Sequence, residues 1–101
     1  MTNEEHRQLI GSVNRALSWP LPEKIRSISA DLAQRQVTLQ FVHDGEAGAA
    51  EKETIAGIER QVEQSMRDYR VDSTLIRVDA PRPYAEQLLP IVVLAMFEQE
   101  E

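Results

Sequence analysis

Phe41-Val42-His43-Asp44-Gly45-Glu46 ends one apolar run of the sequence, and Ile76-Arg77-Val78-Asp79-Ala80-Pro81 ends another. Each run closes in a carboxylate followed by a residue that changes backbone freedom, glycine or proline. A long amphipathic segment separates the two. If the two runs form parallel strands of one sheet, their ends meet at one edge of that sheet. We therefore expect Asp44 and Asp79 to lie close together.

The segments before and between these runs have helical periodicity. Thr2 and Glu5 have the spacing of a capping box, and apolar side chains then recur every three to four residues. This pattern predicts a helix over residues 2–18, which Pro20 and Pro22 end because neither has a backbone donor. A second apolar stripe predicts a helix over about residues 49–68 that covers one side of a sheet.

Four further segments favour strands because apolar side chains alternate along them or fill them completely. The predicted strands are residues 25–30, 36–43, 70–79 and 91–97, with a polar turn at 31–35. The order is αββαββ in an α+β fold. We expect a single four-stranded, mostly antiparallel sheet within residues 24–97, with both helices packed on it.

Length and composition set the class of the protein. A chain of 101 residues predicts one domain, residues 1–101, with an acidic tail at 98–101. The chain has 11 Lys and Arg against 17 Asp and Glu, so its formal charge is −6. Such a charge repels phosphate backbones and anionic lipids and attracts basic proteins. With neither a signal peptide nor a long apolar segment, we expect a soluble cytoplasmic protein that binds neither nucleic acid nor membrane.

Catalytic and metal-binding motifs are not evident in the sequence. There is no cysteine, the two histidines lie far apart in the sequence, and the glycines form no phosphate-binding loop. We therefore expect no catalytic residue, no metal and no cofactor. His43, Asp44 and Glu46 are the best alternative, since a deep pocket around them would favour a small hydrolase or a cation site.

The second predicted helix also carries arginines that suit an RNA-binding face beside Gln61 and Gln64. The same arginines alternate with carboxylates at helical spacing, which more simply predicts surface ion pairs. The charged residues in question are Arg60, Arg67 and Arg70 with Glu59, Glu63 and Asp68.

Two features favour a protein partner. Acidic residues collect where strands end, and the last predicted strand, residues 91–97, is apolar at every position. Its surplus face predicts either a second copy of the chain, in a homodimeric adaptor, or a different partner. The alternative is that the first helix covers this face.

The chain resembles a family of small bacterial contact-dependent growth inhibition immunity proteins. The resemblance covers about residues 13–83. The matching stretches are residues 21–28, residues 39–46, Val71-Asp72 and residues 76–83.

This resemblance implies a non-enzymatic cytoplasmic protein that binds and occludes a toxin domain delivered by a sibling cell. Toxins of this kind are frequently nucleases with a basic substrate groove, which an acidic surface complements. We expect the partner-binding residues to be His43, Asp44, Glu46, Asp79 and, at the rim, Arg82.

Overall fold

The computed structural model describes residues 2–17 and 24–95. The helices are α1 (Asn3–Ala16) and α2 (Ala49–Ser65), with a short 3₁₀ helix, η1 (Ala85–Gln87). The strands are β1 (Ile25–Ala33), β2 (Gln36–His43), β3 (Arg70–Arg77) and β4 (Ile91–Ala95). This order confirms the predicted αββαββ arrangement of an α+β protein.

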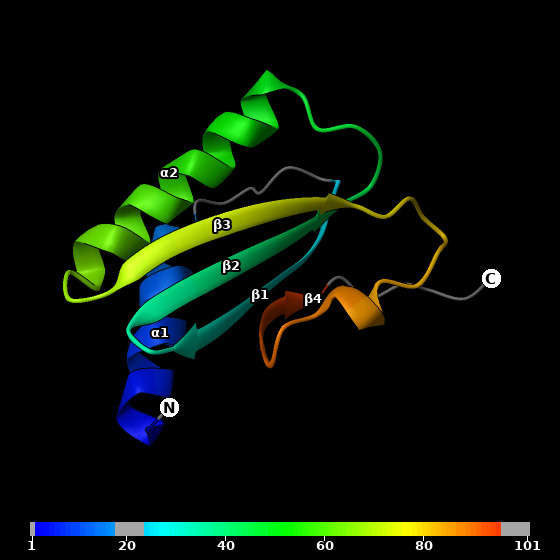
Figure 1. Cartoon of the computed structure of the whole chain (residues 1–101). Coiled ribbons are helices and arrows are strands. Elements are labelled where there is room, and N and C mark those ends of the chain that lie inside the picture. Colours follow the sequence, from blue (N-terminus) through cyan, green and yellow to red (C-terminus); the bar gives the residue numbers. More distant parts are fainter. Residues whose placement is uncertain (1, 18–23, 96–101) are drawn as a thin grey trace.

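The four strands form one mixed sheet in the order β3-β2-β1-β4. β1 is antiparallel to β2 and to β4, while β2 and β3 are parallel. Both helices lie on the same face of the sheet (Figure 1). Val37, Leu39 and Phe41 alternate along β2 on that face and are fully buried, so they form the centre of the core with the apolar stripes of both helices.

The helices end earlier than predicted. The capping box of Thr2 and Glu5 is present, as expected, but α1 ends at Ala16, and residue 18 lies outside the described residues. α2 ends at Ser65 rather than residue 68. Its C-cap, Met66, is buried, and the chain turns there so that Arg70 can begin β3 opposite Gln36.

The hairpin between β1 and β2 is tighter than the predicted turn at residues 31–35. Strand pairing continues to Ala33 opposite Gln36, because Leu32 still buries its side chain on the helix face. Only Gln34 and Arg35 remain in the turn, with φ angles of 52° and 61°. Two central residues with positive φ define a type I′ connection, whose twist matches that of the strands.

The third strand is also shorter than expected. β3 ends at Arg77, after which one further backbone hydrogen bond joins Val78 to His43, and β4 is described as far as Ala95. The rest of the predicted strand, residues 96–97, and the predicted acidic tail, residues 98–101, lie outside the described residues.

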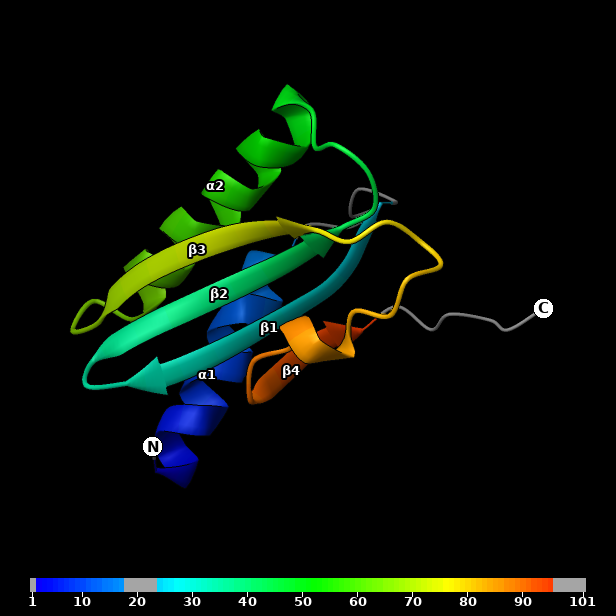
Figure 2. The ribbon, with the colours of Figure 1, turned by 45° about the vertical axis from the view of Figure 1, so that its right-hand side comes forward.

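The connection between these strands, residues 78–90, crosses the sheet face opposite the helices, and we call it the strap. Leu89 donates its backbone N–H to the Ser29 hydroxyl at 2.9 Å, and the Gln40 side chain donates to the carbonyl of Gln87. η1 lies next to β4 in Figure 1 and in front of it in Figure 2. The strap therefore covers part of the face that the helices leave open.

Candidate partner-binding site

The loops that follow β2 and β3 lie side by side, and they contain four of the five residues expected to bind a partner. Parallel pairing places His43 opposite Arg77 at the end of the two strands. The backbone N–H of Val78 then donates to the carbonyl of His43 at 3.0 Å, which extends the pairing by one residue. We call this pair of loops, residues 44–48 and 78–83, the strand-end edge. The sequence-based expectation that Asp44 and Asp79 share one edge is confirmed.

The two aspartates tie the loops together in a reciprocal manner. Asp44 accepts a hydrogen bond from the backbone N–H of Ala80 at 3.0 Å. Asp79 accepts one from the backbone N–H of Gly45 at 2.8 Å. Gly45 has a φ of 78°, which a residue without a Cβ adopts readily. Each carboxylate therefore satisfies a donor of the opposite loop and holds the edge in one shape.

Asp79 also forms a two-point ion pair with Arg77. The arginine Nε and Nη2 donate to the two carboxylate oxygens at 2.9 and 3.1 Å. The hydrogen bond from Arg77, followed by that from the Gly45 backbone, lowers the pKa of Asp79 to about 2. The same pair raises the pKa of Arg77. Arg77 of the same chain thus largely neutralises the charge of Asp79.

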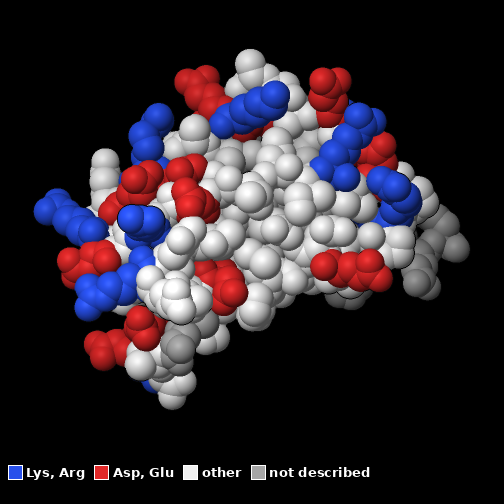
Figure 3. Space-filling model, in the orientation of Figure 1, with Lys and Arg blue, Asp and Glu red and all other residues white. Residues whose placement is uncertain are grey.

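Arg77 was not among the residues that the sequence singled out. Its spacing from Asp79, two residues along one strand end, is the signal that could have found it. Acidic and basic groups accordingly stand side by side at this end of the sheet (Figure 3).

His43 is fully buried on the helix side of the sheet. Its Nδ1 lies 3.0 Å from the carbonyl oxygen of Gly45, so this nitrogen carries the proton and donates. Nε2 has no hydrogen-bond partner among the described residues. His43 borders a pocket of about 150 Å³ together with Glu46, Lys52 and Arg77. Because its ring is buried and bonded to the Gly45 carbonyl, His43 positions the loop at Gly45.

Of the five expected residues, Glu46 and Arg82 are exposed at the strand-end edge, and Asp44 is half-buried. The backbone N–H of Arg82 donates to the carbonyl of Asp79 at 2.9 Å, which places Arg82 at the rim of the second loop. The structure thus separates the five expected residues into three that shape the loops and two that are presented to solvent.

Arg26 anchors the strap to the sheet near this edge, and the sequence did not point to it. The side chain is 5% exposed, and Nη1 donates to the carbonyl of Val78 at 2.7 Å. Its guanidinium also lies over the Tyr84 ring, 4.6 Å from the ring centre. Arg26 stands at an irregularity between Ile25 and Ser27 in the pairing with β2, which only the structure could show.

Across the described ranges 2–17 and 24–95, no three His, Asp or Glu side chains converge as metal ligands. Nor is any helix there sufficiently long and apolar to cross a membrane. A hydrolase or cation site would require His43, Asp44 and Glu46 to face one pocket together. Instead, the His43 ring is buried, and the Asp44 carboxylate accepts a hydrogen bond from the backbone of Ala80.

Fold and site together define a small α+β protein with a pair of charged loops tied to each other at one sheet edge. Residues 6–95 match the family model described as MafI2 immunity protein. The match covers most of the chain, which therefore belongs to the MafI2 immunity protein family. This confirms the immunity-protein family expected from the sequence. No curated protein sequence matches the chain.

Proposed function

We propose that this chain is a non-enzymatic immunity protein that acts in the cytoplasm by binding a cognate toxin domain and occluding its active site. The observation that carries the proposal is the match to the immunity protein family over residues 6–95. The formal charge of −6 supports a basic partner, since opposite net charges speed encounter and improve specificity. Inhibition by occlusion requires no turnover. It requires a surface that keeps its shape when the partner arrives.

We propose the strand-end edge as that surface. Asp44 and Asp79 pre-organise the two loops, and His43 supports the first loop from below. A surface that is already ordered loses little conformational entropy on binding, which favours affinity. Glu46 and Arg82, both exposed, then make the direct contacts, with Asp44 partly accessible between them.

The test is a charge reversal that leaves the loop hydrogen bonds intact. Glu46→Lys should slow association with the cognate toxin domain by roughly three- to tenfold and flatten its dependence on salt. Stopped-flow or surface-binding kinetics at several salt concentrations measure both quantities. Asp44→Asn keeps the carbonyl oxygen that Ala80 needs, so it should give a smaller loss without reshaping the loop.

Asp68→Lys is the matched control, because it makes the same charge change at an exposed position just before β3, at the opposite end of the sheet. If Glu46→Lys and Asp68→Lys slow association equally, the effect comes from net charge alone and the edge is not the contact surface. If the unaltered chain does not bind the toxin domain at all, the immunity function itself is wrong.

A homodimeric adaptor that pairs through the last strand is the second candidate. It is favoured by the position of β4 at one edge of the described sheet and by Val92 of this strand, which is 46% exposed. An unpaired strand edge is a template for pairing with a second copy. A tight dimer of the purified chain in light scattering, lost in Val92→Lys, would support this function over the first.

A further inference from the structure

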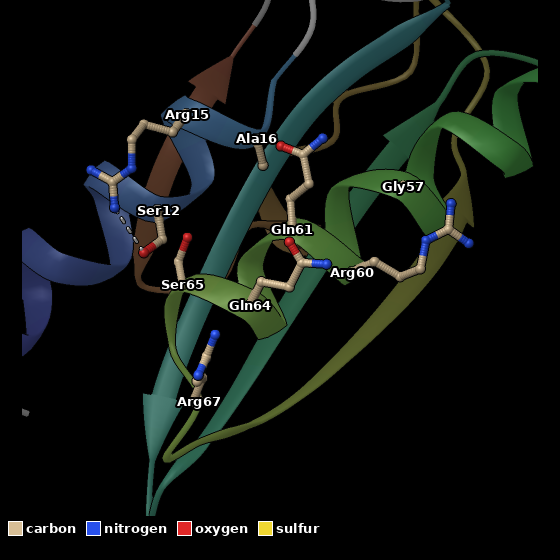
Figure 4. A pocket seen from close by; sticks show the side chains of 9 residues that line it. All are labelled: Ser12, Arg15, Ala16, Gly57, Arg60, Gln61, Gln64, Ser65 and Arg67. Atoms are coloured by element: carbon tan, nitrogen blue, oxygen red, sulfur yellow. Dashed lines mark hydrogen bonds between the residues drawn. The ribbon is translucent and has the colours of Figure 1, made fainter.

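A groove between the two helices carries a charge opposite to that of the molecule as a whole. It has a volume of about 680 Å³ and is walled by α1 on one side and by the second half of α2 on the other. Ser12 and Arg15 of α1 line one side, Gln61 and Gln64 of α2 line the other, and Arg67 stands near one end. The guanidinium of Arg15 points toward Ser12, and that of Arg60 points away from α1, so the two lie on opposite rims (Figure 4). We call it the interhelical groove. It lies on the helix layer, away from the loops of the strand-end edge.

The described residues that line this groove include three arginines, Arg15, Arg60 and Arg67, and no carboxylate. In a chain with a formal charge of −6, a groove bordered by three arginines and no described carboxylate is unexpected from composition. The remaining polar lining consists of amide and hydroxyl groups, which donate or accept hydrogen bonds without adding charge. The groove therefore has the chemistry of an anion-binding surface.

The ion pairs expected for Arg60 and Arg67 are not formed among the residues that the structure describes. Within the described part of the chain, no carboxylate lies within ion-pair distance of Arg60 or Arg67. Glu59, the nearest carboxylate in sequence to Arg60, instead accepts a hydrogen bond from the Ser73 hydroxyl of β3. The prediction that α2 carries salt-bridged surface decoration is therefore wrong for these two arginines. Their guanidinium groups remain available to a partner.

Arg15 is held against α1 beside the groove. Its Nη2 lies 3.5 Å from the Ser12 hydroxyl oxygen, and the guanidinium folds back over Gly11. A Cβ at position 11 would approach Arg15 Nη1 to 3.2 Å, closer than most real contacts, so glycine gives the arginine this room. An arginine restrained in this way loses less side-chain entropy when it binds an anion.

We propose that the interhelical groove docks a short acidic segment of a protein partner. An arginine fork suits carboxylates and phosphates alike, so the choice depends on the rest of the molecule. A net charge of −6 repels an extended polyanion such as RNA, and no described residue that lines the groove is aromatic, so bases have nothing on which to stack. A few Asp or Glu side chains on a folded partner carry less charge and suffer less repulsion.

This inference goes beyond the proposed function and does not depend on it, because the probe is a peptide. The full chain, isotope-labelled for NMR, is titrated at neutral pH with a short peptide of alternating Glu and Ser. A uridine oligonucleotide of equal charge is titrated separately. We expect the peptide to shift the amide signals of Ser12, Gly57 and Gln61. Arg60→Glu combined with Arg67→Glu should weaken this binding at least about fivefold.

The control makes the same change in charge outside the groove, with Arg7→Glu and Arg70→Glu, both at exposed positions. Arg60→Gln with Arg67→Gln is a second test variant that removes both positive charges without introducing carboxylates. Groove signals that do not respond to the peptide would overturn the proposal. Tighter binding of the oligonucleotide, or an equal loss in the control, would overturn it as well. If the peptide binds here while the toxin domain does not bind the chain, only the immunity function fails.

Discussion

At the scale of single residues, acidic side chains that the sequence does not distinguish have different roles in the structure. Asp79 is tied to Arg77 and to the Gly45 backbone, while Glu46, on the neighbouring loop, is exposed to solvent. The charge that a partner meets at the strand-end edge is consequently smaller than the number of acidic residues there suggests. Burial likewise decides the role of His43, which supports the loop from inside.

Because of Asp79, the stability of the folded protein should fall as the solution becomes acidic. Its pKa is about 2 in the folded state, against an ordinary value of 3.8. A group with a lowered folded-state pKa stabilises the fold above its unfolded pKa, and this contribution disappears as the pH falls from about 4 toward 2. Asp79→Asn should therefore lower the unfolding temperature at pH 7 and flatten its fall between pH 4 and 2. Circular dichroism melts across this range measure the effect.

Asp68→Asn serves as the comparison for this variant, because Asp68 is exposed and stands at the other end of the sheet. It should leave both the melting temperature and its pH profile nearly unchanged. An Asp79→Asn profile that runs parallel to that of the unaltered chain would show that the Arg77–Asp79 pair does not contribute to stability.

At the scale of elements, each helix and strand follows from a local pattern, while its ends depend on contacts with other elements. α1 begins at its capping box, as its sequence indicates, and Glu5 of that box also accepts a hydrogen bond from the Tyr69 hydroxyl at 3.0 Å. This bond raises the pKa of Tyr69 and, after the Thr2 backbone N–H, helps to lower that of Glu5. The start of α1 is thus joined to the start of β3.

The turn between β1 and β2 stores backbone strain that substitution can remove. Gln34 and Arg35 both have positive φ, a conformation that costs about 1 kcal/mol or more for an ordinary L-residue. Gln34→Asn with Arg35→Gly introduces the pair that type I′ turns favour, so the free energy of unfolding should rise by about 1–2 kcal/mol. Urea denaturation at equilibrium measures the change.

Two β-branched residues in the same turn should have the opposite effect on stability. Gln34→Val with Arg35→Val should lower the free energy of unfolding, because valine is strained at positive φ. Equal stability of the valine and glycine variants would mean that the turn does not hold the type I′ geometry in solution.

At the scale of the whole molecule, the helices cover one face of the sheet, the strap crosses the other, and two strands remain at the edges. Among the strands that the structure describes, β1 and β2 pair on both sides, whereas β3 and β4 pair on one side only. Local opening requires less free energy where fewer contacts must break. Hydrogen exchange should accordingly be slowest at the amides of Ile28 and Leu39, and faster along β3, β4 and the strap.

The same measurement tests the arrangement of β4 in solution. If β4 exchanges as slowly as β2, and more slowly as protein concentration rises, a second copy covers this edge and the homodimeric adaptor gains support. Fast exchange at all concentrations agrees with a monomer whose β4 edge is open.

The sequence by itself determined the order of the elements, because periodicity, the capping box and the prolines are local signals. It also determined that Asp44 and Asp79 would meet, since parallel strands end at one edge. The tertiary structure alone decided where the hairpin turns, which arginine pairs with Asp79 and which arginines remain unpaired by described carboxylates. Those outcomes depend on distances between segments remote in the chain, and spacing along a sequence does not contain such distances.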